Sequence, residues 1–246
     1  MKKIDDSYVN NIKETLLKTI KEVENPIAAF DADGTLWPTD MGEVFFRYQI
    51  KNNLIDLPPK PWEHYINLHS EKPKDAYLWL AQINKGRNIN KVREWAQTAV
   101  DEKKNFEIFD EQKQIIDLFH DNNVPVYIVT ASVKWAVEPA AKKFNIPFEN
   151  VVGIVTKVEN DIVTDIQGGP ITYREGKVNA LLEHTNNIKP FFASGNTMGD
   201  ISLVECATHH SLTIRSADKQ NSNWDSEESL NKISTEKNWF QLNYLP

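Results

Sequence analysis

Cysteines, long apolar runs and basic tracts are scarce or missing in this sequence. Of its 246 residues only Cys206 is a cysteine, so no disulfide can form within the chain. No apolar run approaches the length of a transmembrane helix, and the first ten residues, MKKIDDSYVN, lack the apolar core of a secretion signal. We therefore expect a cytoplasmic protein that does not bind a membrane.

An excess of positive charge is missing too. Lysine and arginine number 28 and the acidic residues 35, which gives a formal net charge of −7. This balance argues against nucleic acid as a partner, although a small anion can still bind where positive charge is concentrated. The composition, 40% hydrophobic and 26% charged, is that of a globular protein with a sizeable core.

Apolar runs and helical patterns alternate along the chain. The expected strands are 27–30, 125–129 and 190–193, and the expected helices are 5–23, 109–121, 133–145 and 175–184. Such alternation predicts an α/β fold, a Rossmann-like parallel sheet with helices on both faces. Residues 151–157 and 162–166 predict a small β-hairpin, and residues 216–229 a polar loop.

The segment between the first two expected strands is too long for a simple crossover. Its patterns are mostly helical, with aromatic residues as apolar anchors. We therefore expect residues 41–105 to form an inserted all-α cap domain. Residues 1–40 and 106–246 would then form the α/β core domain, which would carry the catalytic residues.

Polar residues follow three of the expected strands. Asp31 and Asp33 come directly after the first strand, Thr130 after the second, and Asn196 after the third. In open sheets of this kind, ligands bind beyond the carboxyl ends of the strands. One site that combines these residues is therefore expected, and two carboxylates this close together suggest a shared cation, proton transfer, or both.

Four stretches resemble, in order, the four motifs of the haloacid dehalogenase superfamily of phosphohydrolases. FDADGTLW (30–37) resembles the first motif, DxDGT, and VYIVTAS (126–132) the second, an apolar strand ending in Thr or Ser. Lys177 in YREGKVNAL matches the third motif. SGNTMGD (194–200) resembles the fourth, whose usual form is GDxxxD. The position of the expected cap, between the first two motifs, resembles that in the phosphoserine-phosphatase-like subgroup, which has helical caps.

Phosphoryl transfer needs an in-line nucleophile and neutralisation of the phosphate oxygens. Asp31 is the expected nucleophile, forming an aspartyl-phosphate, and Mg²⁺ would offset the repulsion between its charge and the phosphate. Asp33 would protonate the leaving oxygen and later deprotonate water. Thr130 would donate a hydroxyl to phosphate, and Lys177 would supply positive charge.

The other motif residues are expected to contact substrate or metal. Gly34 permits a backbone turn that a side chain disfavours, and we expect it to bind substrate together with Thr35, Ala131 and Ser132. The superfamily resemblance implies that the main-chain carbonyl of Asp33 joins Asp31 as a metal ligand.

The fourth motif departs from the usual form. Asn196 stands where that form has an aspartate that binds metal, and an amide offers an oxygen without charge. Three alternatives follow: Asn196 coordinates Mg²⁺ weakly, Asp200 contributes directly or through water, or the enzyme is impaired. We expect Asn196→Asp to tighten Mg²⁺ binding and Asp200→Asn to loosen it.

Two features bear on the substrate. In the resembling phosphoserine phosphatases, an acidic residue nine positions after the nucleophile contacts the substrate amine, and Asp40 has this offset. Asp40-x-x-Glu43 equally resembles a helix cap. Trp37, Trp62 and Tyr65 would either form an aromatic pocket for a quaternary ammonium or pack the cap on the core.

The sequence therefore predicts a Mg²⁺-dependent phosphomonoester hydrolase that acts on a small phosphorylated metabolite. The candidate substrates are amine-bearing compounds such as phosphoserine or phosphocholine. The alternatives are a phosphomutase or phosphotransferase of the same superfamily, and a catalytically weak protein that binds a phosphorylated metabolite.

Overall fold

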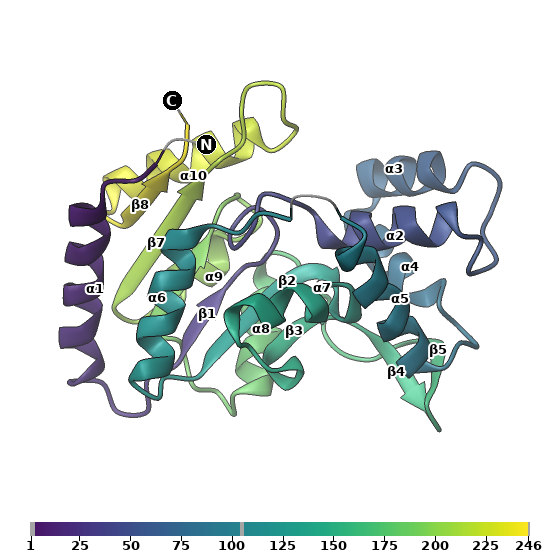
Figure 1. Ribbon diagram of the computed structural model, residues 1–246, viewed down its shortest axis with the longest axis horizontal. Coiled ribbons are helices and arrows are strands. Elements are labelled where there is room, and N and C mark those ends of the chain that lie inside the picture. Colours follow the sequence, from purple (N-terminus) through teal and green to yellow (C-terminus); the bar gives the residue numbers. More distant parts are fainter. Residues whose placement is uncertain (1–2, 104–105, 246) are drawn as a thin grey trace.

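A six-stranded sheet forms the centre of the molecule. The computed structural model describes residues 3–103 and 106–245, so the outermost residues of some predicted ranges (1–2, 104–105 and 246) lie outside the described residues. The strands are β1 (Ala28–Phe30), β2 (Val126–Val133), β3 (Val151–Ile154), β6 (Phe192–Gly195), β7 (His210–Arg215) and β8 (Phe240–Asn243). They lie in the order β3-β2-β1-β6-β7-β8, with five parallel pairings (Figure 1). The predicted Rossmann-like sheet is confirmed.

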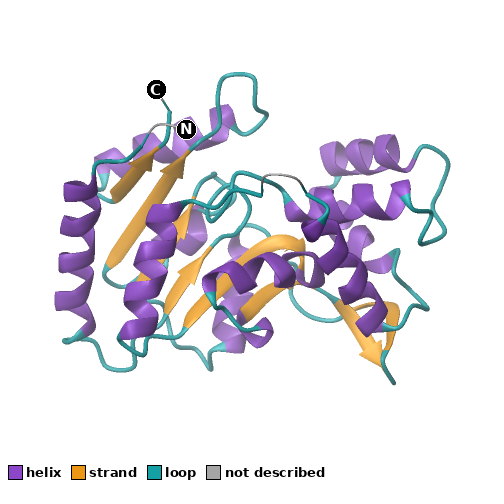
Figure 2. Ribbon diagram, viewed as in Figure 1, coloured by secondary structure: helices purple, strands orange, loops and turns teal. Residues whose placement is uncertain are grey.

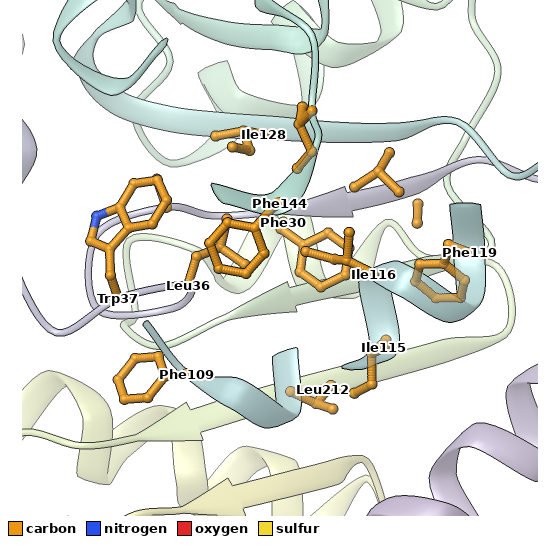
Figure 3. Packing of buried hydrophobic residues seen from close by; sticks show 14 of the residues in the cluster. Phe30, Leu36, Trp37, Phe109, Ile115, Ile116, Phe119, Ile128, Phe144 and Leu212 are labelled. Carbon is orange, nitrogen blue, oxygen red and sulfur yellow. The ribbon is translucent and has the colours of Figure 1, made fainter. Parts of the chain in front are cut away.

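Helices cover both faces of this sheet, as predicted. One face carries α1 (Asp6–Ile20), α6 (Asp110–Asp121) and α7 (Lys134–Ala141), and the other carries α8 (Glu175–His184), α9 (Ile201–Glu205) and α10 (Trp224–Glu236). Side chains alternate between the faces along each strand. In β1, Phe30 therefore packs with Ile116 and Phe119 of α6 (Figure 3). Ala28 belongs to the same cluster, whereas Ala29 packs under α8 and α9. Burial on both faces explains why β1 is apolar throughout.

Four further helices lie together beside the carboxyl ends of β2 and β3. They are α2 (Met41–Lys51), α3 (Pro61–Glu71), α4 (Pro73–Gln82) and α5 (Ile89–Asp101), seen at the right of Figure 2. Proline at the first position suits the starts of α3 and α4, and Asp40 and Asn88 cap α2 and α5. Phe45, Phe46 and Val92 share a buried cluster with Trp135 of α7. This cluster is separate from the one beneath α1 and α6. Among all described residues, no helix is both long and apolar enough to cross a membrane.

A short hairpin, β4 (Thr156–Glu159) and β5 (Ile162–Gln167), lies beside these four helices. Asn160 and Asp161 form its turn with positive φ angles of 50° and 64°, which suit a tight two-residue connection. The prediction of residues 151–157 as one hairpin strand was wrong. Residues 151–154 form β3 of the main sheet, and the apolar run shows no break where the chain leaves that sheet.

The prediction of a polar loop over residues 216–229 was wrong from residue 224 onwards. There α10 begins, with Asp225 and Glu227 in its first turn, where acidic side chains favour a helix N-terminus. Its buried Leu230 and a hydrogen bond of 2.9 Å between Ser234 and Thr213 hold it against β7. As a result α10 brings its N-terminus close to the loop that follows β6.

Candidate active site

A cleft of about 600 Å³ opens at the carboxyl ends of the strands. The structure brings the predicted site residues together there, although they come from distant parts of the sequence. The predicted residues that line the cleft are Asp31, Asp33, Gly34, Asp40, Thr130, Ala131, Ser132, Lys177, Asn196 and Asp200. Among the residues predicted for catalysis, metal binding or direct substrate contact by the motifs, Thr35 lies outside this lining.

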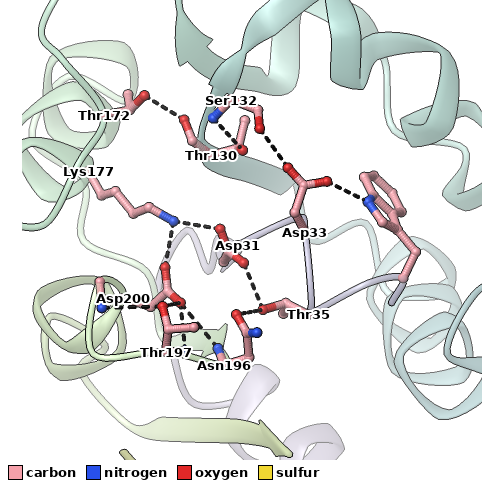
Figure 4. A network of polar contacts seen from close by, with 12 residues as sticks. Asp31, Asp33, Thr35, Thr130, Ser132, Thr172, Lys177, Asn196, Thr197 and Asp200 are labelled. Atoms are coloured by element: carbon pink, nitrogen blue, oxygen red, sulfur yellow. Dashed lines mark hydrogen bonds and ion pairs between the residues drawn. The ribbon is translucent and has the colours of Figure 1, made fainter. Parts of the chain in front are cut away.

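Asp31 stands directly after β1, and its N–H continues the ladder by donating to the carbonyl of Ser194 at 2.9 Å. Its carboxylate is 5% exposed and accepts two hydrogen bonds. Lys177 Nζ donates to Oδ1 at 2.5 Å and Thr35 Oγ1 to Oδ2 at 2.8 Å (Figure 4). Burial and the nearby Asp200 raise the pKa of Asp31 to about 7 against the opposing effect of Lys177.

Lys177 on α8 is 2% exposed and joins two carboxylates. Its Nζ lies 2.5 Å from Asp31 Oδ1 and 2.5 Å from Asp200 Oδ1. Burial alone would lower the pKa of Lys177, but the two carboxylates raise it above its ordinary value. The lysine is therefore a fixed positive charge at the floor of the cleft.

Asp33 has no lysine or arginine partner among the described residues and accepts three hydrogen bonds instead. Trp37 Nε1 and the N–H of Met41 donate to Oδ1 at 2.7 and 2.9 Å. Ser132 Oγ donates to Oδ2 at 2.7 Å (Figure 4). Burial and the negative charge of Asp40 raise the pKa of Asp33 to about 7, despite these donors. At neutral pH this carboxyl can both give and accept a proton.

Thr130, Ala131 and Ser132 lie in the last part of β2, where the pairing with β3 shifts register. Such irregularities re-aim side chains at the rim of a sheet. Ser132 donates its N–H to Thr130 Oγ1 at 3.0 Å, and the buried Thr172 donates its hydroxyl to the Thr130 carbonyl. Thr172 was missed in the sequence, because a threonine outside the four motifs carries no signal.

Asn196 follows β6 and is 1% exposed. It packs against the first-motif loop so closely that a Cβ on Gly34 would lie 2.0 Å from its Nδ2. Gly34 also has φ of 85°, so glycine is required there for two reasons. Thr35 is fully buried below this contact, and its hydroxyl lies 3.2 Å from Asn196 Oδ1 and 2.8 Å from Asp31 Oδ2. Thr35 is thus placed to orient Asp31 and Asn196 rather than to touch a ligand in the cleft.

Asp200 uses both of its oxygens inside the protein. Oδ1 accepts from Lys177, and Oδ2 accepts from the N–H groups of Asn196 and Thr197 at 3.2 and 3.0 Å and from the Thr197 hydroxyl at 3.0 Å. Gly195 gives it room, since a Cβ there would lie 2.5 Å from Asp200 Cβ. The Asp200 carboxylate therefore shapes the loop after β6 and holds Lys177.

The donor set around Asp31 fits Mg²⁺. The Asp31 carboxylate, the Asn196 amide oxygen and the main-chain carbonyl of Asp33 are oxygen donors of the kinds that Mg²⁺ prefers. Within the described part of the chain, no group of three or more His, Cys, Asp or Glu side chains could hold a metal ion. Asp31 and Asn196 therefore offer one charged and one neutral oxygen, both close to the Thr35 hydroxyl, of the kinds that Mg²⁺ takes.

A further carboxylate touches this group of residues. Glu227 on α10 is 2% exposed, and its Oε1 accepts from Asn196 Nδ2 at 2.9 Å. Burial raises the pKa of Glu227, while hydrogen bonds from Ala217, Asn196 and Ser216 oppose this shift. Glu227 could not be found from sequence, because it lies in a segment that looked like a polar loop.

Asp40 caps α2 and also lines the cleft. Its Oδ1 accepts from the N–H of Glu43 at 2.7 Å, as the capping interpretation predicts. Part of the Asp40 side chain is exposed in the cleft. Partial burial of its carboxyl group and the negative charges of Glu43 and Asp31 raise the pKa of Asp40 to about 6. Capping thus leaves Asp40 within reach of a ligand.

Of the three residues considered for an aromatic pocket, only Tyr65 lines the cleft. Trp37 is fully buried between Phe106 and Phe144, and Trp62 packs on Phe46 and Arg47 outside the cleft. Trp37 thus packs on residues outside the segment 41–105 and Trp62 on residues of α2, and neither tryptophan lines the cleft. The aromatic residues that line the cleft are Tyr65, Tyr77 and Tyr173, together with His69. Tyr77 and Tyr173 have ring centroids 5.5 Å apart, and His69 Nε2 lies 2.8 Å from the Tyr77 hydroxyl.

Comparison with solved structures finds the same fold in distant proteins. A protein of unknown function from Bordetella pertussis Tohama I is 13% identical, with a TM-score of 0.73 over 91% of this chain and 100% of that chain. A phosphoserine phosphohydrolase-like protein from Francisella tularensis subsp. tularensis SCHU S4 is 15% identical, with a TM-score of 0.56 over 88% and 94%. A phosphoserine phosphatase with bound substrate is 14% identical, with a TM-score of 0.52 over 87% and 99%.

Identities this low show a shared fold and nothing more, and a search of curated proteins finds no match. The family model for haloacid dehalogenase-like hydrolases, in contrast, matches residues 28–205. That span is well over half of the chain and runs from β1 to α9, so it includes Asp31, Thr130, Lys177 and Asp200. The chain belongs to the haloacid dehalogenase-like hydrolases.

Proposed function

We propose that this hydrolase is a Mg²⁺-dependent phosphatase that hydrolyses small phosphomonoesters through an aspartyl-phosphate. The observation that carries the proposal is the different setting of the two aspartates. Asp31 lies beside a buried lysine, whereas Asp33 has no lysine or arginine partner among the residues that the structure describes and accepts hydrogen bonds from Trp37, Met41 and Ser132. The first setting suits a nucleophile and the second an acid–base group.

In the first step, an Asp31 oxygen attacks the substrate phosphorus and the bond from phosphorus to the ester oxygen breaks. Asp33, in its acid form, protonates the departing alkoxide, so an alcohol leaves and Asp31 carries the phosphoryl group. Lys177 and the Thr130 hydroxyl hold the phosphoryl oxygens. Asp31, Asn196 and the Asp33 carbonyl would hold Mg²⁺, and when bound this ion would supply positive charge that offsets the repulsion between the anionic nucleophile and the anionic phosphate.

In the second step, Asp33 is ionised and takes a proton from water. The resulting hydroxide attacks phosphorus, and the bond between phosphorus and the Asp31 oxygen breaks. Inorganic phosphate leaves, Asp31 is an anion again, and Asp33 holds the proton needed for the next turnover. The three hydrogen bonds to Asp33 from Trp37, Met41 and Ser132 fix its position through both steps.

We propose that the helices within residues 41–105 act as a cap domain over this chemistry. Residues on α2, α3 and α4 line one side of the cleft, opposite the ends of the strands. A covering wall keeps water away from the reacting phosphate in the first step and selects the substrate.

The character of this wall favours a substrate that carries an amine. Asp40 and Glu43 supply negative charge, while Tyr65 and Tyr77 supply aromatic faces. A carboxylate binds ammonium groups of any kind, and aromatic faces attract quaternary ammonium in particular. Phosphoserine, phosphoethanolamine and phosphocholine are therefore the candidate substrates.

Phosphate release from an aryl phosphate tests the reaction itself. We expect turnover with Mg²⁺ and none with a chelator, and a protein that binds the ester without releasing phosphate would contradict the proposal. A second panel tests the substrate class by comparing the three amine-bearing esters with glycerol phosphate. Equal kcat/KM values for amine-bearing and neutral esters would contradict amine recognition and leave the phosphatase proposal intact.

A further inference from the structure

The side chain of Asn196 is held between the metal-site residues and Glu227. On one side its Oδ1 lies 3.2 Å from the Thr35 hydroxyl, which also bonds Asp31. On the other side its Nδ2 donates to Glu227 Oε1 at 2.9 Å. An asparagine amide can sit in either of two orientations, so its partners decide which end faces the metal site.

Glu227 fixes the orientation of the Asn196 amide. Its Oε2 accepts the N–H groups of Ser216 and Ala217, both at 2.8 Å, so its second oxygen is left for Asn196. An ionised carboxylate only accepts hydrogen bonds, and the amide must therefore turn Nδ2 toward it. Oδ1, the end that can bind a cation, is consequently turned toward Asp31.

We propose that Glu227 is a positioning residue of the metal site, which holds the Asn196 amide with its oxygen directed at Mg²⁺ and supplies the negative charge that asparagine lacks. The pair Asn196–Glu227 would thus do the work of a single aspartate. This inference rests on the proposed Mg²⁺ site. Carboxylates in contact with metal ligands commonly orient those ligands and strengthen them as donors.

The contact with Glu227 also changes the expectation for Asn196→Asp. That substitution places a second carboxylate at hydrogen-bond distance from Glu227, with no proton between them. The repulsion of two like charges offsets the added attraction for Mg²⁺. We therefore expect Asn196→Asp alone to increase Mg²⁺ affinity less than it would if Glu227 were not beside it.

Glu227→Gln tests the positioning role, because it keeps the shape of the side chain. The N–H groups of Ser216 and Ala217 still require an oxygen, so the new amide nitrogen faces Asn196. Asn196 must then turn its own oxygen away from Asp31 to accept this donor. We expect Mg²⁺ affinity to fall about 10- to 100-fold, the usual loss when a carboxylate behind a metal ligand is removed.

The double variant Asn196→Asp/Glu227→Gln again pairs one carboxylate with one amide, but now the carboxylate is at residue 196 and the amide at residue 227. One aspartate oxygen accepts the glutamine N–H, and the other is directed at the metal site. We expect this variant to bind Mg²⁺ at least as tightly as the wild type. A merely structural role of Glu227 would not be rescued by a change at residue 196.

The measurement is Mg²⁺ affinity by calorimetry at constant pH, together with the rise in melting temperature on adding Mg²⁺. Glu228→Gln is the matched control, since Glu228 is the next residue on α10 and pairs with Arg215 instead. Melting in chelator shows whether each variant is folded. Wild-type affinity in Glu227→Gln, or no recovery in the double variant, overturns the inference. A wild type that does not bind Mg²⁺ overturns the proposed metal site itself.

Discussion

The floor of the cleft and the wall opposite differ in how their side chains are held. The floor is Asp31, Asp33, Thr130, Lys177 and Asn196, and the wall is Asp40, Tyr65, His69 and Tyr77. On the floor, Asp31, Lys177 and Asn196 are at most 5% exposed, and their polar atoms have partners from several elements. On the wall, Tyr65 is 4% exposed, but Asp40 is exposed and His69 and Tyr77 are half-buried.

This difference separates two tasks. Groups that stabilise a transition state must be in place before the reaction, because moving them during it costs free energy. Groups that recognise the rest of the substrate can adjust, and an aromatic wall contributes through shape and charge distribution rather than through fixed hydrogen bonds. We therefore expect substitutions on the floor to abolish turnover of every ester, and substitutions on the wall to change the choice among esters.

The largest effect is expected for Asp31→Asn, which removes the nucleophile and keeps its shape. Turnover of all phosphomonoesters should fall by about 10⁴-fold or more, as for other enzymes that lose a nucleophile. Lys177 keeps Asp200 as a partner, so the fold should survive. Phosphate release and circular dichroism measure the two outcomes, and a folded variant with near wild-type turnover would remove Asp31 from the role.

The next effect is expected for Asp33→Asn, which removes the proton donor. Turnover of alkyl phosphates should fall about 10²- to 10⁴-fold, the usual contribution of a general acid. An aryl phosphate, whose leaving group needs less help from a proton, should lose less. Equal losses on alkyl and aryl esters would argue against proton donation by Asp33.

The same residue predicts a pH dependence. The pKa of Asp33 is raised to about 7, so the acid form that protonates the leaving group is lost as pH rises through about 7. The step that cleaves an alkyl ester should therefore slow above that pH, and a pre-steady-state burst of alcohol measures this step alone. A burst rate that stays constant from pH 6 to 9 would contradict the assignment.

The floor was largely visible in the sequence, whereas of the wall only Asp40 and Tyr65 were named, and His69 and Tyr77 were not. Asp31, Thr130 and Asn196 each follow an apolar run, and parallel strands bring their carboxyl ends to one edge. Tyr77 and Tyr173 meet only through packing between helices and the segment before α8, and no local spacing encodes that contact. Glu227 was missed for the same reason, since its partner is 31 residues away in the chain.

Some strands of the sheet can be recognised in the sequence and others cannot. The buried strands β1 and β2 are recognisable because each contains a continuous apolar run. In β7 the sequence HSLTIR mixes polar and apolar residues. A buried polar residue is tolerated there because the Thr213 hydroxyl forms a hydrogen bond with Ser234 on α10. A strand whose polar side chains find buried partners has no clear apolar pattern to read.

On the wall, the larger effect is expected for Asp40→Asn. Asparagine caps helices as well as aspartate does, so α2 should keep its start and only the charge is lost. We expect kcat/KM for amine-bearing phosphates to fall about tenfold, the worth of one hydrogen bond to a charged group, and neutral esters to be unaffected. Equal losses on both classes would show that Asp40 acts only as a cap.

The charge of Asp40 can also be removed by pH. Its pKa of about 6 means that the carboxylate is present above that pH and is lost as pH falls through it. The preference for amine-bearing over neutral esters, taken as a ratio at each pH, should therefore grow between pH 5 and 7. In the Asp40→Asn variant most of this rise should disappear, and any rise that remains measures the contribution of Glu43, the second carboxylate that lines the cleft on this side.

The smallest effect is expected at Tyr77, where ring and hydroxyl can be separated. Tyr77→Leu removes the aromatic face and should raise KM for phosphocholine about two- to fivefold, the worth of a partly exposed cation–π contact. Tyr77→Phe loses only the contact of 2.8 Å with His69 and keeps the ring, so KM for phosphocholine should stay close to wild type. KM for glycerol phosphate should not change in either variant. If Tyr77→Phe raises KM as much as Tyr77→Leu does, the hydroxyl and His69 hold the substrate, and the wall works by fixed hydrogen bonds as the floor does.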